Sequence, residues 1–466
     1  MMKKYFNIIT AVAIVLFASA CHKAETFKIS QPTVQVGNII KSDTLSGTVK
    51  GTLLSGKTYY FASNITVNGG DTLLMQAGSK LIALGDGKTA ATAPEIFVHG
   101  TFISLGTKDN QNYITVSNSA QLHSEAGQQN YTDVFQGWWG GIFCTPGAAA
   151  TAEDPNPAGG DLIIKWTHLE FAGSPAGDDD NHAIYADGDP RWTIYFANIT
   201  KNFILEDSWI FGSKDDAMRV AGGHMDIMRN TYELCGLAAG EACNIKSGSV
   251  GDVGYNMIIG AATNAFKISD AGSTGTQCNI NCYNNTIVNC GFRQNSTSGH
   301  GGSIDFEKAA KGNAYNNMII NCAIGLRVLS SSDITNVHYN NQLYYGYNTA
   351  LVAQFNATDG KSTFQSGDIY SATPQQNDPL FYGFDVNAYN YTQFPAPATA
   401  SNQTPAIVMV GTSSFRPKAA SPAIGKASTT AVSYNTVTST GTYGATITAP
   451  GKDIGAYQYD GTGNQH

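Results

Sequence analysis

Two related stretches decide the fold: Tyr283-Asn-Asn-Thr-Ile-Val-Asn-Cys290 and Tyr315-Asn-Asn-Met-Ile-Ile-Asn-Cys322. Each has a pair of asparagines, a short apolar run and then Asn-Cys. Looser copies keep the order of a polar residue, an apolar run and a small residue, and they begin at Trp166, Asp207, Asn230, Asn256 and Asn341. A motif that returns at intervals of roughly 25 residues indicates a repeat architecture.

A second short pattern follows each copy. It consists of a small residue, an apolar residue, a variable residue and usually another apolar one, as in Ala217-Met-Arg-Val and Ala265-Phe-Lys-Ile. In a strand, this alternation directs the second and fourth residues inward and the third outward. The other members are Ala183-Ile-Tyr-Ala, Ala242-Cys-Asn-Ile, Ser303-Ile-Asp-Phe, Gly325-Leu-Arg-Val and Ala350-Leu-Val-Ala.

A unit of roughly 25 residues with two or three short strands cannot bury its own apolar face. Stacking solves this, because each strand then pairs in parallel with its equivalent in the next unit, about 4.8 Å away. The recurring Asn285 and Asn317 are expected to form ladders of stacked amides at a turn, which explains them without a catalytic role. A β-propeller needs antiparallel blades of about 40–50 residues and fits less well. We expect an all-β solenoid.

Composition agrees with many short strands joined by tight turns. The 466 residues include 50 glycines, and only 13% of the chain is charged. Gly and Asn tolerate the positive φ angles that turns need, and the long runs of Ala, Leu, Glu and Lys that favour helical bundles are absent. The net charge of −8 argues against nucleic acid as a partner, because such proteins present a basic face.

The N-terminus resembles a bacterial lipoprotein signal peptide. Lys3 and Lys4 form a basic start, residues 8–17 are apolar but too short to span a bilayer comfortably, and small residues precede Cys21. The resemblance implies cleavage before Cys21, its lipidation, and attachment to the outer membrane at the cell surface or the periplasmic face. Each buried acyl carbon contributes about 0.8 kcal/mol, so two or three chains anchor firmly. Plain secretory cleavage is the alternative.

Of the eight cysteines, seven remain once Cys21 is set aside. An odd number in an oxidising compartment leaves at least one thiol unpaired. We expect these cysteines to serve mainly as small buried side chains of the repetitive core.

The two opening stretches also carry a family resemblance. They are similar to the repeats of right-handed parallel β-helix proteins, a pectate-lyase-like superfamily that includes polysaccharide lyases and polygalacturonase-like hydrolases. The segments Gly56-Lys-Thr-Tyr-Tyr-Phe61 and Asp453-Ile-Gly-Ala-Tyr457 resemble the entry and end regions of such proteins. The likeness covers roughly residues 45–460 and implies a right-handed single-stranded parallel β-helix.

Four regions follow from these patterns. Residues 1–20 are the expected lipoprotein signal peptide, and residues 21–45 a tether. Residues 46–355 are expected to form the parallel β-helix. Residues 356–466, rich in Thr, Ser, Ala and Pro, are expected to form an irregular C-terminal cap that packs on the helix.

Stacking in register lines up the outward residues of the second strand. The expected row is Tyr185, Arg219, Asn244, Lys267, Asp305, Arg327 and Val352. Lys246 and Glu307 lie two places further along their strands. Because this face mixes cations, acids and an amide, it suits a groove for an acidic polysaccharide.

The resemblance to β-helix lyases implies roles for this row. In such lyases a Lys or Arg base removes a proton next to a carboxylate, and calcium or another cation neutralises that carboxylate. The implied catalytic residues are Lys267, Arg327 and Arg219, and the implied cation ligands are Asp305 and Glu307. The implied substrate-binding residues are Asn244, Lys246, Tyr185 and His300.

Two other functions stay open. Ser213-Lys-Asp-Asp-Ala-Met-Arg-Val and Ser298-Gly-His300-Gly are similar to motifs of polygalacturonase-like hydrolases, but they lie several repeats apart and a downstream Arg-x-Lys motif is missing. The acidic run Asp178 to Asp180 also suits a solvated or calcium-binding loop. A non-catalytic surface rod or adhesin is the other alternative, because outward positions of any soluble sheet are charged and alternating signs reduce repulsion.

Overall fold

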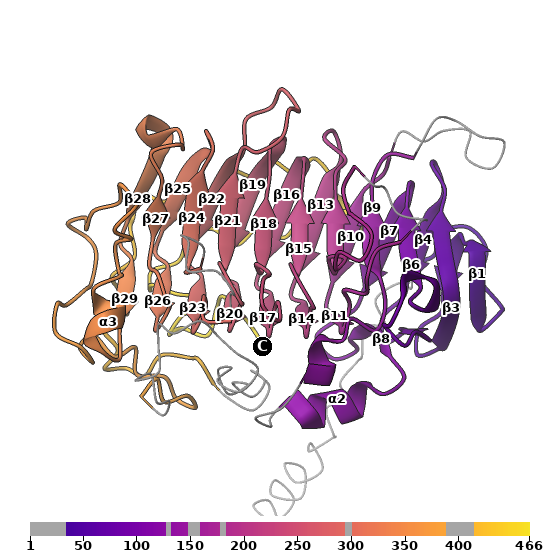
Figure 1. Ribbon diagram of the computed structural model, residues 1–466, viewed down its shortest axis with the longest axis horizontal. Coiled ribbons are helices and arrows are strands. Elements are labelled where there is room, and N and C mark those ends of the chain that lie inside the picture. The colour runs from indigo at the N-terminus through magenta and orange to yellow at the C-terminus, as the bar shows by residue number, and fades with distance from the viewer. Residues whose placement is uncertain (1–33, 127–131, 148–158, 178–182, 294–300, 388–413) are drawn as a thin grey trace, which may run out of the picture. The chain divides into compact units, whose positions relative to one another are not determined.

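The protein is predominantly β, and its strands form two sheets in which the named strands pair in parallel (Figure 1). The computed structural model describes residues 34–126, 132–147, 159–177, 183–293, 301–387 and 414–466. Residues Gln35–His466 form one unit. The predicted lipidation site Cys21 and the predicted binding residue His300 lie outside the described residues, as does the acidic run at 178–180.

One sheet has ten strands that stack in chain order. They are β2 (Gly51–Leu53), β4 (Thr72–Met75), β7 (Thr101–Leu105), β10 (Leu162–Lys165), β13 (Asn202–Glu206), β16 (Gly223–Met228), β19 (Ser249–Gly254), β22 (Asn279–Tyr283), β25 (Lys311–Tyr315) and β28 (Val337–Asn340).

The other sheet has nineteen strands and consists of two ladders joined at the long strand β3 (Thr58–Val67), which also pairs with β1 (Thr44–Thr48). Ladder A contains β5 (Lys80–Ala83), β8 (Asn112–Val116), β11 (Thr167–Glu170), β14 (Trp209–Phe211), β17 (Thr231–Glu233), β20 (Met257–Ile259), β23 (Thr286–Val288), β26 (Met318–Ile320) and β29 (Leu343–Tyr345). Ladder B contains β6 (Glu95–Val98), β9 (Gly141–Cys144), β12 (Ile194–Phe196), β15 (Met218–Val220), β18 (Cys243–Ile245), β21 (Phe266–Ser269), β24 (Ile304–Glu307) and β27 (Arg327–Val328).

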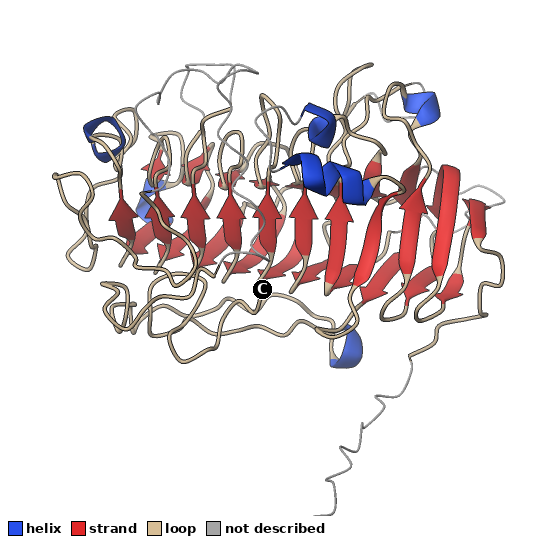
Figure 2. Cartoon of the chain, turned by 90° about the horizontal axis from the view of Figure 1, so that it is seen from below, coloured by secondary structure: helices blue, strands red, loops and turns tan. Residues whose placement is uncertain are grey.

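The chain visits the ten-stranded sheet, ladder A and ladder B in the same order from β4 to β29, as in β13, β14 and β15. Figure 2 shows strands of successive turns side by side, with loops at their ends. The helical segments are short: α2 (Ser119–Ala126), α3 (Thr349–Val352), η1 (Ala90–Thr92), η2 (Thr132–Phe135), η3 (Ile334–Asn336) and η6 (Gly441–Tyr443). Within the described ranges, no helix is long and apolar enough to cross a membrane. The arrangement is compatible with a parallel β-helix.

A repeated corner joins the ten-stranded sheet to ladder A and explains the Asn-Asn pairs. The first asparagine adopts a left-handed conformation, with φ of 51° at Asn284 and 60° at Asn316, which asparagine tolerates better than most residues. The second asparagine points inward and bonds to the next turn: Asn285 Nδ2 donates to Asn317 Oδ1 (2.9 Å). The same ladder continues at Asn230, Asn256 and Gln342. The predicted amide ladder is confirmed.

The inward residues of all three strand sets form one continuous apolar core. All seven described cysteines are buried, with free thiols. Apolar side chains on successive parallel strands stack over one another, so each turn supplies the cover that its neighbour lacks.

The described part of the C-terminal tail packs on the outside of the stacked strands (Figure 1, yellow). Phe415, Ile454 and Tyr457 form an apolar cluster with residues of ladder A. Further along, the buried Asp252 of β19 accepts hydrogen bonds from the backbone N–H groups of Tyr434 (2.8 Å) and Asn435 (2.7 Å). Apolar contacts and hydrogen bonds to a buried carboxylate therefore both attach this irregular segment to the stacked strands.

Two of the expected strands are wrong. Residues 183–186 lie in a short excursion closed by an isolated bridge between Pro175 and Pro190. The strand that pairs with β15 is β12, because Ile194-Tyr-Phe196 offers three residues that favour strands. Residues 349–352, which include Val352, form helix α3, whose N-cap Asn348 accepts a hydrogen bond from the N–H of Leu351 (3.0 Å). The predicted boundary at residue 45 falls inside β1.

Candidate functional site

Ladder B brings five of the predicted site residues into one line. The register pairs Arg219 with Asn244, Asn244 with Lys267, Lys267 with Asp305, and Asp305 with Arg327. These residues are 108 positions apart from first to last (327 − 219) but stand on adjacent parallel strands. Tyr185 is not in this row, since Tyr195 holds the position opposite Arg219.

Acids from neighbouring strands and loops pair with the cations of this row. Arg219 Nη2 lies 2.8 Å from Asp216 Oδ2, and Lys267 Nζ lies 3.5 Å from Glu241 Oε1. At the other end of the row, Arg327 Nη1 lies 2.8 Å from Asp305 Oδ2, and Arg327 Nη2 lies 3.2 Å from Asp359 Oδ2. Asn244 Nδ2 donates to Asp216 Oδ2 (2.8 Å). We call these residues, together with Trp192, Asp215, Lys246 and Glu307, the ladder B cluster.

The carboxyl groups near Arg219 differ in pKa. Burial and the neighbouring charge of Asp216 raise the pKa of Asp215 to about 7. Burial also opposes ionisation of Asp216, but Arg219 and several hydrogen bonds overcome it and hold this pKa at about 2. Burial and the charge of Asp216 raise the pKa of Glu241 well above its usual range. Asp216 therefore loses its proton far more readily than Asp215 or Glu241.

The cations also differ in pKa. Burial and the like charges of Arg219 and Lys267 lower the pKa of Lys246 to about 8. Burial lowers the pKa of Lys267 too, but Glu241 and Glu307 reverse that effect and raise it above its usual range. A general base is most effective when its pKa lies near the working pH. Lys246, predicted as a binding residue, is thus better suited to be the base than Lys267.

Asp305 and Glu307 were the expected cation ligands. Both belong to β24, but Asp305 Oδ2 is engaged by Arg327 (2.8 Å). Burial raises the pKa of Asp305 to about 6, and its Oδ1 is buried without a hydrogen-bond partner. Across the described segments, no group of three or more His, Cys, Asp or Glu residues is placed to hold a metal ion.

Trp192 and Glu241 belong to this cluster although the sequence patterns did not single them out for it. The Arg219 guanidinium carbon lies 3.8 Å from the centroid of the Trp192 ring, within the range of a cation–π contact. Glu241 precedes β18 by two positions, where Asp216 precedes β15 by two. The recurrence of an acidic residue two positions before these strands could have identified Glu241 from the sequence.

A second titratable cluster lies on ladder A, and it was not predicted from the sequence. Glu170 is buried, and it accepts hydrogen bonds from Thr115 Oγ1 (2.7 Å) and His123 Nε2 (3.0 Å). His168 Nδ1 lies 3.4 Å from the same carboxylate. His168 and Glu170 are two positions apart on β11, so both point outward. That spacing was visible in the sequence. His123, however, comes from helix α2, which is not part of the repeat, so its position could not be predicted.

This cluster makes the free energy of unfolding depend on pH in the acidic range. Burial alone would raise the pKa of Glu170, but hydrogen bonds from His123 and His168 lower it to about 2, against 4.5 for a free side chain. A lowered folded-state pKa gives stability that is present above pH 4.5 and lost as the pH falls toward 2. From that shift of 4.5 to about 2, the loss is about 3 kcal/mol.

We therefore expect Glu170→Gln to flatten the acid limb of the stability curve. The measurement is urea unfolding of wild type and variant at pH 5, 4, 3 and 2. The free-energy difference between the two proteins should shrink by about 3 kcal/mol over this range. Exposed Asp109 provides the control, because Asp109→Asn should leave the curve unchanged. Parallel curves for wild type and Glu170→Gln would contradict the assignment.

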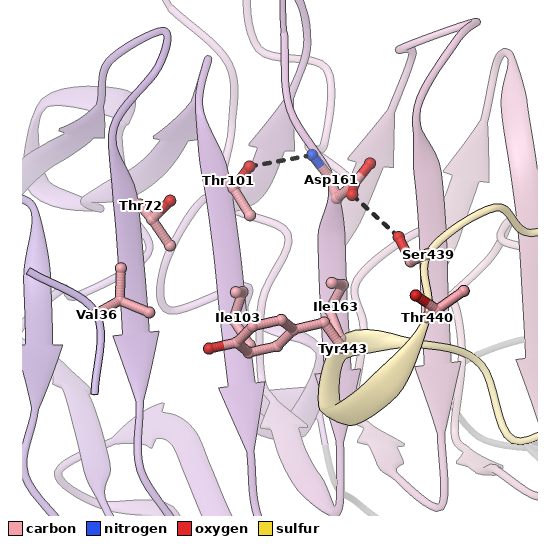
Figure 3. A pocket seen from close by; sticks show the side chains of 9 residues that line it. All are labelled: Val36, Thr72, Thr101, Ile103, Asp161, Ile163, Ser439, Thr440 and Tyr443. Carbon is pink, nitrogen blue, oxygen red and sulfur yellow. Dashed lines mark hydrogen bonds between the residues drawn. The ribbon is translucent and has the colours of Figure 1, made fainter. Parts of the chain in front are cut away.

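A hollow of about 400 Å³ lies between the tail and the ten-stranded sheet (Figure 3). Ile103 and Ile163 of the sheet face Tyr443 of the tail, and Asp161 Oδ2 accepts a hydrogen bond from Ser439 Oγ (3.2 Å). Its described lining contains a single ionisable acid, Asp161, together with apolar and hydroxyl side chains. We interpret this hollow as part of the tail's attachment.

Comparison with protein-family models, with curated proteins and with solved structures found no match for this chain. The fold and the site therefore define its class on their own: a predominantly β protein of two long all-parallel sheets. Its ladder B carries an in-register row of four charged side chains and one amide, Asn244.

Proposed function

We propose that this chain is a right-handed parallel β-helix protein, exported and lipid-anchored through Cys21, whose ladder B binds an acidic polysaccharide and cleaves it by β-elimination. The regular order of ten-stranded sheet, ladder A and ladder B supports the β-helix. Its hand follows from the strong preference of parallel strand crossovers for the right-handed sense. The short basic, apolar and small-residue sequence before Cys21 supports export.

The observation that carries the activity is the grouping of Lys246 with Arg219 and Lys267 on consecutive turns of ladder B. Elimination needs a base and, beside it, positive charge to stabilise the carboxylate of the substrate as the proton leaves the adjacent carbon. Arg219 and Lys267 stand on β15 and β21, and Lys246 directly follows β18 between them. With strands about 4.8 Å apart, the three cations offer both functions within the length of one or two sugar rings.

The chemistry assigns a step to each group. Lys246 Nζ, as the neutral amine, takes the proton from the carbon next to the sugar carboxylate. Arg219 and Lys267 stabilise the negative charge that develops there. The bond to the leaving oxygen breaks as the carbon–carbon double bond forms, and Asp215 supplies the proton that this oxygen takes up.

The pH dependence follows from two of these groups. Asp215 acts in its protonated form and loses its proton above a pKa of about 7, whereas Lys246 acts in its neutral form, which grows toward and above a pKa of about 8. Activity should therefore peak between pH 7 and 8 and fall on both sides. Asp215→Asn should cost 10- to 100-fold in kcat and remove the fall on the alkaline side. A wild-type alkaline limb retained in this variant would exclude Asp215 as the acid.

The test of the function is a panel of acidic polysaccharides incubated with the purified protein. Absorbance of unsaturated products reports elimination, and new reducing ends without that absorbance report hydrolysis. Absorbance with at least one polymer is the expected result. A panel with neither signal would refute cleavage and leave the non-catalytic rod or adhesin, which the mutual pairing of Arg327 with Asp305 also favours.

Hydrolysis is the second candidate because one observation favours it. Asp215 and Asp216 carry pKa values of about 7 and about 2, and such a split often marks an acid and an ionised partner in glycosidases. New reducing ends that persist in Lys246→Ala and vanish in Asp216→Asn would select this reaction over elimination.

A further inference from the structure

A cavity of about 510 Å³ lies on the outer face of ladder A, beneath helix α2. Its volume falls in the range of roughly 300–1,000 Å³ that is usual for small-molecule sites. The ladder B cluster shares no residue with it. The lining comes from β3, β5, β8, α2 and β11: Thr58, Tyr60, Lys80, Ile82, Tyr113, Thr115, Val116, Ser117, Ser119, Ala120, His123 and Glu170.

The floor of this cavity is rigid and polar. Glu170 is held by Thr115 and His123, as described above, and the His123 ring packs against Phe211 with centroids 4.5 Å apart. His123 Nδ1 is buried and has no partner in the described structure. With Nε2 on Glu170, Nδ1 is the ring nitrogen that remains to bond a ligand seated deeply enough to contact it.

The rim combines a cation, aromatic rings and hydroxyl groups. Lys80 is exposed and forms no ion pair with any residue that the structure describes, and its Nζ lies 5.3 Å from the centroid of the Tyr113 ring. Tyr60 is 39% exposed, so a ring face or edge is open at the mouth. Thr58, Ser117 and Ser119 add hydroxyl groups. Hydroxyl groups and an aromatic surface suit a sugar ring, and Lys80 suits an anionic substituent.

We propose that this cavity is a second carbohydrate site that binds one acidic sugar residue, with Lys80 and His123 holding its carboxylate. We expect the site to bind without cleaving, because Glu170 is already engaged by Thr115 and His123. Its place on ladder A, away from the row on ladder B, allows a polysaccharide to be held at one position while it is processed at another.

Binding should weaken with rising pH because His123 loses its proton. Burial lowers the pKa of His123, but the hydrogen bond and charge of Glu170, with a smaller contribution from Glu233, raise it overall. The other charged or titratable groups around the cavity are Tyr60, Lys80, Tyr113 and His168. Glu170 stays ionised over the range tested, so the change comes from the histidine.

The experiment is isothermal titration of the full chain with D-glucuronate, and with D-glucose as the neutral match, at pH 6 and pH 8.5. Glucuronate is expected to bind at least tenfold more tightly than glucose at pH 6. At pH 8.5 most of this difference in affinity should disappear. Lys80→Met should weaken glucuronate binding about tenfold, and His123→Gln should remove the pH dependence. Lys418→Met, at an exposed lysine of the tail, is the matched control.

Equal binding of the two sugars, or no binding of either at millimolar concentration, would overturn this proposal. So would unchanged glucuronate binding in Lys80→Met and His123→Gln when their unfolding curves match wild type. Lys246→Ala separates this site from the proposed cleavage, since it should lower the rate of elimination at least about 100-fold and leave glucuronate binding intact.

Discussion

Replacing Lys246 by alanine is expected to lower kcat for elimination 10²- to 10⁴-fold while changing KM little. Loss of a positioned general base has effects of this size. Stability should hardly change, because Lys246 forms no ion pair in the described structure and desolvation already disfavours its charge. The measurement is the initial rate of unsaturated product, with polymer concentration varied at pH 7.5.

Two comparisons sharpen this prediction. Lys267→Ala should raise KM or lower kcat through lost charge stabilisation, and it should also destabilise the protein, since Glu241 and Glu307 lose their nearest cation. Lys418→Ala, at an exposed lysine of the tail, should behave like wild type. A wild-type kcat in Lys246→Ala would exclude Lys246 as the general base.

Replacing Asn285 by leucine is expected to destabilise the fold by about 3–5 kcal/mol. Asn285 Oδ1 accepts from the backbone N–H of Asn256 (3.0 Å) and from Asn256 Nδ2 (3.0 Å). Its own Nδ2 donates to Asn317 Oδ1 (2.9 Å) and to the carbonyl of Val253 (3.1 Å). Leucine has a similar shape but forms none of these bonds, so buried donors and an acceptor remain unpaired.

Urea unfolding followed by circular dichroism measures this loss. Asn336 is the matched control, because it is exposed and donates to Asp333 Oδ2 (2.8 Å) outside the stack. Asn336→Leu should change the free energy of unfolding by less than about 0.5 kcal/mol. A loss below 1 kcal/mol for Asn285→Leu would mean that the amide ladder contributes little to stability.

The repeat made much of this structure predictable from sequence. Period-two alternation correctly directed Arg219, Asn244, Lys267, Asp305 and Arg327 outward, and parallel stacking brought them into one row. The Asn-Asn pairs identified the corner, because one asparagine adopts the left-handed conformation and the next joins the ladder.

The errors arose where local pattern competes with tertiary pairing. Residues 183–186 and 194–196 both alternate, and only the pairing with β15 selects the second. His123 reaches Glu170 from a helix inserted between β8 and β9, which no repeat can place. The proposed exchange of roles between Lys246 and Lys267 depends on which charged groups surround each ammonium group, and this requires side-chain geometry.

The most direct measurement is a crystal structure of Lys246→Ala with an oligosaccharide fragment of the polymer that the wild type cleaves. We expect the fragment to lie across successive turns of ladder B, with a sugar carboxylate beside Arg219 and Lys267 and the adjacent carbon facing position 246. A fragment bound elsewhere, with the Arg219–Asp216 and Lys267–Glu241 pairs unchanged and uncovered, would contradict the proposal.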